Sequence, residues 1–401
     1  MSKLKNSGNN KFPPLGPSIP QSTASSPTKS AVRDLRFYYH DGSAVFLAGN
    51  KLFKFQASLL AADADVQDYE FKPMMQNTID DFWAEMDRPG TSDARPIVLP
   101  PDVTSNCFRR FLISVFGGVG HPALANLLEN LQTPSSRDPA VLSHLMGVGY
   151  LASRFGMTRI DAWSQRHIHT ILTSWLPPYP ENWDTEFVLQ LAQYMQSTTV
   201  TGYSYDILVR MRLILACLVT DAYDRDKDAP RGRIIDMCAA LYNRKDLLIN
   251  GPGLFGFLFA VVVSLGHRSS IWTNDLTRED RRVLYAASTI LTCLRDQADL
   301  GIHWFSNRSV LNSTCSQCSH FVNLWWHDVF SECGDFQSRV LLEDIRRVVA
   351  LPSYHLRFRE LADRKSFSCQ CLNKINADIE QHIEDVYCNL TEKYTFLVQT
   401  V

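Results

Sequence analysis

The sequence predicts an α+β protein in which a small strand-containing domain precedes an all-helical C-terminal domain. Residues 37–55 form short apolar runs separated by Asp41-Gly42 and Gly49-Asn50, a pattern typical of strands joined by tight turns. Beyond Pro177-Pro178, apolar residues instead recur at the three- and four-residue spacing of helices. The chain has 401 residues, of which 45% are hydrophobic and 20% charged, so two folded units with their own cores are expected.

The expected domain organisation has three parts. Residues 1–33 are rich in Ser, Pro, Asn and Lys and predict a disordered tail, because such a segment buries too little apolar surface to offset its ordering entropy. Residues 34–176 form the strand-containing domain, which ends before the double proline. Residues 177–401 form the helical domain.

In the first domain, strands are predicted at 37–39, 44–48, 51–55 and 96–100. The stretch 63–94 is acidic and shows no clear periodicity. Asp102 or Thr104 is expected to cap the helix that contains Phe108, and Thr158 to cap the last helix of the domain. The other helices are expected at 57–62, 123–131, 139–155 and 158–172.

In the second domain, the apolar run Leu254–Leu265 predicts a buried helix, because a membrane-spanning helix needs about 20 apolar residues. The remaining helices are expected at 187–195, 205–223, 233–242, 278–294, 321–330, 338–349 and 373–387.

Three stretches of the first domain resemble a known family. They are FYYHDGSAVFLAGNKLFKFQASLLAADADV, RPIVLPPDVTSNCFRRFLISVFGG and LMGVGYLASRFGMTRIDAWSQRHI, and together they follow the order hairpin, helix, proline-flanked strand, helix and further helices. This order resembles the BTB/POZ domain over about 140 residues, from Leu35 to Trp175. It is most similar to divergent fungal BTB-like proteins that carry a helical C-terminal half.

The resemblance implies a protein–protein interaction scaffold or adaptor, with a homodimer and a cullin-type ubiquitin-ligase scaffold as the implied partners. The role of ubiquitin-ligase substrate adaptor follows from the second partner. The sequence departs from the family pattern at two places, and both lie near the surface that the family uses for dimerisation and for docking cullin-type scaffolds. Gln56 stands where many members have His, and the Ser-x-x-Phe-x-x-(Met/Leu)-Phe pattern is missing after Ala62.

Cysteines of the C-terminal half suggest a metal site. Cys315 and Cys318 have the two-residue spacing of a zinc knuckle, and Cys369 and Cys371 would supply the other two thiolates of a structural zinc site. The second pair has one intervening residue, and roughly 50 residues separate the pairs. A reduced cluster without metal therefore remains an alternative, as do substitute ligands from Cys333, His320 and His327. A structural zinc-binding regulatory protein is accordingly the alternative function.

An aromatic pair predicts a contact surface in the first domain. Phe82 and Trp83 lie among the carboxylates of residues 80–87, and aromatic side chains often anchor protein interfaces. The alternative is that both rings pack inside the domain.

Charge and motifs narrow the remaining function classes. A net charge of -2 argues against nucleic acid as a partner, and the polar N-terminus is not of the signal-peptide type. We therefore expect reduced thiols and a place in the cytoplasm or nucleus. Phosphate-binding glycine motifs such as GxxxxGK[ST] do not occur in the sequence, and we expect a binding protein without a catalytic site rather than an enzyme.

Overall fold

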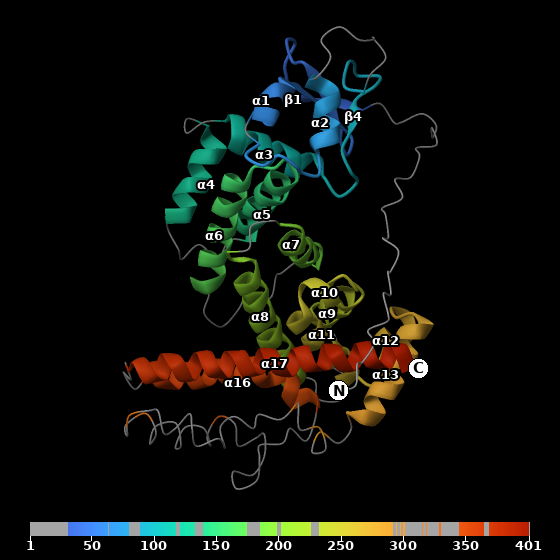
Figure 1. The fold of residues 1–401 in the computed structure, drawn as a ribbon, viewed down its shortest axis with the longest axis vertical. Coiled ribbons are helices and arrows are strands. Elements are labelled where there is room, and N and C mark those ends of the chain that lie inside the picture. The colour runs from blue at the N-terminus through green and yellow to red at the C-terminus, as the bar shows by residue number, and fades with distance from the viewer. Residues whose placement is uncertain are drawn as a thin grey trace, which may run out of the picture.

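The structure is a computed structural model. This structure describes residues 31–62, 64–79, 89–117, 121–132, 139–174, 185–198, 202–225, 232–291, 345–364 and 369–400, and the single residues 294, 297, 300, 315, 318 and 329. A small sheet lies towards one end of the molecule, two long helices run side by side near the other, and most of the remaining helices lie between them (Figure 1). The α+β class is therefore observed, with helices predominating.

The sheet contains β1 (Val32–Tyr38), β2 (Ala44–Ala48), β3 (Lys51–Phe55) and β4 (Ile97–Val98) in the order β1-β3-β2-β4. The predicted hairpin is confirmed: β2 and β3 are antiparallel, and Gly49 takes a φ of 59° in the turn, a conformation that glycine adopts without strain. β1 differs from the expectation. It begins inside the expected tail, and it pairs in parallel with β3 rather than with its neighbour in sequence, β2.

The helices of this part are α1 (Ala57–Ala62), α2 (Lys72–Ile79), α3 (Ser105–Phe116), α4 (Pro122–Gln132), α5 (Pro139–Arg154) and α6 (Thr158–Ser174). Thr104, one of the two residues predicted to cap α3, does so: its side-chain hydroxyl accepts a hydrogen bond from the backbone N–H of Cys107. The helix expected at 158–172 is confirmed as α6, but Thr158 is its first residue rather than its cap. The carboxylate of Asp65, more than 90 residues earlier in the chain, accepts from the backbone N–H groups of Thr158 and Arg159 at 2.8 and 3.1 Å.

The C-terminal part is helical, as predicted, in the residues that the structure describes. Its helices are α7 (Thr185–Ser197), α8 (Ser204–Arg225), α9 (Arg233–Tyr242), α10 (Leu247–Asn250), α11 (Pro252–Ser264), α12 (Ser270–Asn274), α13 (Arg278–Ile290), α16 (Ile345–Arg364) and α17 (Gln370–Thr400). Of the helix expected at 321–330 the structure describes residue 329 alone, and the start of the one at 338–349 lies outside the described residues. α16 and α17 both extend well beyond their predicted C-terminal ends.

α16 continues through Pro352, at which periodicity alone would end a helix. Proline has no N–H, so the carbonyl of Val348 loses its partner four residues on. The hydroxyl of Tyr387 on α17 donates to this carbonyl at 2.8 Å. A side chain from a neighbouring helix thus replaces the missing backbone hydrogen bond, and α16 persists.

α11 is the most deeply buried helix of the described chain, which confirms the prediction for Leu254–Leu265. Twelve of its thirteen residues are buried, and it packs against α8, α9, α10, α13, α16 and α17. Two glycines set its contact with α17. A Cβ on Gly253 would collide with the carboxylate of Glu384, and one on Gly256 would collide with the backbone carbonyl of Tyr387. The two helix backbones therefore approach more closely than larger residues would allow.

Two apolar clusters form the core. The smaller lies between the sheet, α3 and α5, where the rings of Phe53 and Phe108 meet edge to face with centroids 5.0 Å apart. The larger extends from Leu127 to Leu397. It includes Leu142 of α5 together with Leu191 of α7, so apolar packing is continuous across the boundary expected at 176/177. Pro177 and Pro178 themselves lie outside the described residues.

We predict that Gly256→Ala destabilises the full chain by about 2–3 kcal/mol, because the added methyl group would force α11 away from α17. The matched control is Gly202→Ala, since a Cβ there meets no atom within 4 Å. Its effect should stay within about 0.5 kcal/mol. Urea unfolding of both variants measures the difference, and equal midpoints would contradict this account of the helix contact.

Candidate functional site

Four cysteines predicted from the sequence as a metal site come together in the structure. The sulfur atoms of Cys315, Cys318, Cys369 and Cys371 all lie within 4.8 Å of one another. The Sγ atoms of Cys315 and Cys369 are 3.8 Å apart. The two pairs, which are separated by roughly 50 residues of sequence, therefore lie beside each other, and metal binding by them stays a prediction.

The start of α17 positions one of the two pairs. Cys369 immediately precedes α17 and its carbonyl accepts from the backbone N–H of Leu372, whereas Cys371 lies in the first turn. The one-residue spacing, which departs from a zinc knuckle, thus falls across a helix start, where the two side chains can converge. Cys318 is fully buried as part of the larger apolar cluster, while Cys315 is exposed.

One thiol of this cluster, that of Cys315, differs from the isolated thiols of the chain. Two hydrogen bonds from Cys318 lower the pKa of the Cys315 thiol to about 7. The larger effect comes from the backbone N–H of Cys318 and the smaller from its thiol. Burial raises the pKa of the Cys318 thiol. Burial also raises the pKa of Cys238 to about 12 and of Cys217 to about 11, so these two thiols stay protonated and act as small apolar residues, as the sequence indicated.

Several predicted residues lie outside the part of the chain that the structure describes. They include the substitute metal ligands Cys333, His320 and His327, and the aromatic pair Phe82 and Trp83. The contact surface predicted at Phe82 and Trp83 therefore stays a prediction.

A second candidate site lies at the edge of the sheet, where sequence reasoning missed it. β1 is an edge strand, and its pairing with β3 is interrupted between Arg33 and Tyr38. In this bulge, the carboxylate of Asp34 accepts from the backbone N–H groups of Arg36 and Phe37 at 3.0 and 3.1 Å. The bulge turns Leu35 outward, and its side chain is completely exposed.

An ion pair holds this bulge against the domain. Asp34 is 2% exposed, and its carboxylate receives the guanidinium of Arg109 on α3. Burial opposes ionisation of Asp34, but the hydrogen bonds from Arg109 and from the backbone of Phe37 outweigh it, and the pKa of the carboxyl is lowered. The only sequence signal for this site was an acidic residue within a β-prone segment.

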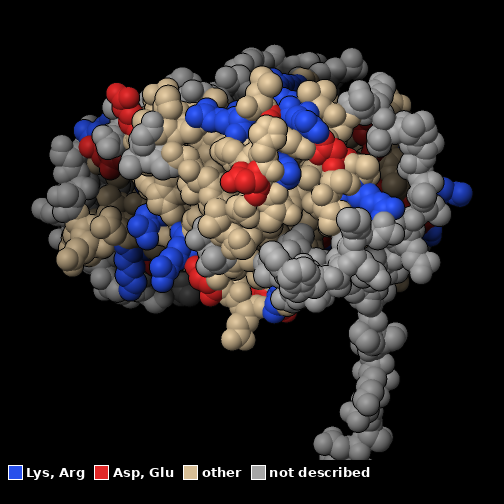
Figure 2. Space-filling model, turned by 90° about the horizontal axis from the view of Figure 1, so that it is seen from above, with Lys and Arg blue, Asp and Glu red and all other residues tan. Residues whose placement is uncertain are grey.

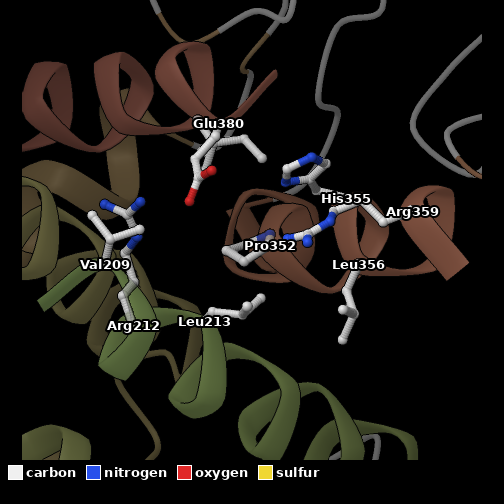
Figure 3. Close-up of a pocket in the computed structure, with 9 residues that line it drawn as sticks. Val209, Arg212, Leu213, Pro352, His355, Leu356, Arg359 and Glu380 are labelled. Carbon is white, nitrogen blue, oxygen red and sulfur yellow. The ribbon is translucent and has the colours of Figure 1, made fainter. Parts of the chain in front are cut away.

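A small cavity between α8, α16 and α17 is lined by apolar side chains together with the charged groups of Arg212, Arg359 and Glu380 (Figure 3). Its volume of about 20 Å³ is enough for a single water molecule. Arg212 Nε and His355 Nε2, both buried on its walls, have no hydrogen-bond partner among the described atoms. Burial, together with the charge of Arg359, lowers the pKa of His355 to about 3, so this imidazole is neutral at pH 7.

A wider groove of about 470 Å³ lies beside Lys245, Asp280 and Tyr394. The ammonium of Lys245 is 2.9 Å from the carboxylate of Asp280 and 3.5 Å from the ring centroid of Tyr242. Both charges are therefore balanced within the protein, and the arrangement joins α13 to the end of α9 rather than presenting a reactive group.

Neither the surface charge nor the comparison with known proteins indicates what binds at the cysteine cluster or at the sheet edge. Basic and acidic side chains are interspersed on the face seen in Figure 2. Among the described helices, none combines the length and apolar character required to cross a membrane. No family model, curated protein or solved structure matches this chain.

We predict that Asp34→Asn lowers the stability of the full chain at pH 7 by about 2 kcal/mol, because the ion pair with Arg109 is lost. The pKa of Asp34 is lower in the folded chain than in the unfolded chain, where it is about 3.9. The ionised carboxylate therefore contributes fully to stability above about pH 3.9, and this contribution is lost as pH falls through the pKa of the folded chain. The difference between wild type and variant should therefore shrink at acidic pH.

Urea unfolding between pH 7 and pH 3 measures this difference. Asp41→Asn, in the exposed turn after β1, is the control and should leave stability nearly unchanged. A wild-type advantage over Asp34→Asn that stays constant down to the lowest pH would contradict the assignment.

Proposed function

We propose that this chain binds other proteins through its N-terminal sheet, as a non-catalytic scaffold with a BTB/POZ-type module. The order of the observed elements supports the proposal. A β2–β3 hairpin is followed by α1, α2, the strand β4 and then α3 to α6, and β4 lies parallel to β2. Apart from α2, which lies in the stretch 63–94 where no helix was expected, this is the order on which the sequence resemblance rests.

The observation that carries the proposal is the exposed edge of β1. Leu35 is fully exposed and Val32 is 60% exposed on the same strand, and the outer backbone of an edge strand can pair with another strand. Asp34 takes the N–H groups of Arg36 and Phe37, so a second strand would pair with the rest of this edge. Asp34 and Arg109 fix the bulge beneath Leu35, so the apolar side chain is presented on a rigid base. A pre-ordered apolar residue loses little entropy on binding and is suited to anchor an interface.

The partner that fits this edge most simply is a second copy of the chain. Two identical edge strands can pair around a twofold axis, with Leu35 of each copy covered by the other. Self-association is also what the family resemblance implies. Docking of a cullin-type scaffold, and with it the role of ubiquitin-ligase adaptor, stays a prediction of the resemblance alone.

We predict that Leu35→Glu weakens self-association of the full chain by at least about 30-fold, because a charge would replace the central apolar contact. Ile249→Glu is the matched control: Ile249 is 85% exposed but lies on α10, in the helical half. Sedimentation equilibrium over a range of concentrations measures the association constants. A wild-type chain that stays monomeric, or a Leu35→Glu variant that associates as well as Ile249→Glu, would contradict the proposal.

A further inference from the structure

We propose that Cys315, Cys318, Cys369 and Cys371 bind one structural zinc ion. This proposal does not depend on the sheet-edge function, because the two sites lie in different parts of the chain and share no residue. It rests on the distances between the four sulfur atoms, on their chemistry and on the elements that carry them.

The sulfur distances match a tetrahedral zinc site. A Zn–S bond of about 2.3 Å places the corners of a regular tetrahedron about 3.8 Å apart. The Sγ atoms of Cys315 and Cys369 are 3.8 Å apart, and the widest separation among the four thiols stays within 4.8 Å. A disulfide needs a separation of about 2.0 Å. The cluster therefore has the dimensions of a metal site rather than those of a pair of disulfides.

The donor set selects the metal. Thiolate sulfur is a soft ligand that favours zinc over the oxygen-preferring cations magnesium and calcium. Four protein ligands fill a tetrahedral shell and leave no position open for substrate, so a zinc ion here would be structural. Binding converts four thiols to thiolates and releases their four protons to solvent, and the zinc ion keeps its oxidation state throughout.

α17 also favours the negative charge of such a centre. Cys369 precedes this 31-residue helix and Cys371 lies in its first turn, where unpaired backbone N–H groups make the helix end electropositive. The resulting tetrathiolate centre carries a net charge of about -2, which this helix end would stabilise. The exposed Cys315 gives the ion a route to the site, while Cys318 lies in the apolar core.

A bound ion would fasten the segment around Cys315 and Cys318 to the beginning of α17. Roughly 50 residues of chain lie between Cys318 and Cys369, including the whole of α16. Closing a loop of this length removes conformational freedom from the unfolded chain and stabilises the folded one.

The test is the metal content of the full-length chain, purified under reducing conditions and then supplied with zinc sulfate. Wild type should retain about one zinc ion per chain after removal of the excess. Cys315→Ser and Cys369→Ser should each retain at least tenfold less. Cys388→Ser is the matched control, because Cys388 lies further along α17 and outside the cluster, and it should bind zinc as wild type does.

A second measurement separates loss of the ligand from loss of the fold. Cobalt offered in place of zinc should give wild type and Cys388→Ser the visible absorption of a tetrahedral thiolate complex, with near-native far-ultraviolet circular dichroism in all variants. Adding a chelator should lower the melting temperature of wild type and Cys388→Ser but not that of Cys315→Ser.

Three outcomes would overturn the proposal. In the first, reduced wild type retains no zinc. In the second, the purified chain holds iron at this cluster in place of zinc. In the third, Cys315→Ser and Cys369→Ser remain folded and retain as much zinc as Cys388→Ser.

Discussion

The structure of the C-terminal half depends on the burial of α11. Almost every side chain of this helix is apolar and buried, so no face of it can be left to water. Burying an apolar side chain contributes roughly 1.5–3 kcal/mol, and α11 carries many of them. Six other helices must therefore surround it, and the order in which they pack follows from this requirement. α17 has the closest approach, because Gly253 and Gly256 remove the side chains that would hold the two backbones apart.

The position of α17 determines several features that are distant in sequence. Tyr387 reaches the carbonyl left free by Pro352, which lets α16 continue as a helix. Glu384 pairs with the buried Arg212 of α8, where either charge alone would be costly. The start of α17 holds Cys369, just before the helix, and Cys371, in its first turn, within reach of Cys315 and Cys318. The proposed zinc site and the apolar core are thus connected through one helix: packing on α11 aligns α17, and metal binding would secure the N-terminal end of α17.

Local features of the fold were predictable, and long-range partners were not. The β2–β3 hairpin, the cap at Thr104 and the buried helix α11 follow from residues close together in sequence, for which turn chemistry and periodicity are sufficient. Asp65 at the start of α6, and Tyr387 beside Pro352, are partners that periodicity does not identify. The cysteine site is an intermediate case. Thiols have few alternative roles, so spacing alone suggested the four residues, whereas the ion pair of Asp34 with Arg109 is one of many charge pairs that the sequence allows.

We infer from this packing that α11 and α17 form one cooperative unit. Native-state hydrogen exchange of the full chain, followed residue by residue against denaturant, tests it most directly. We expect the buried amides of both helices to exchange together, with a common opening free energy that is among the highest in the protein. Exchange of α17 at low denaturant while α11 remains protected would contradict the account, since the buried helix would then keep its structure without its closest neighbour.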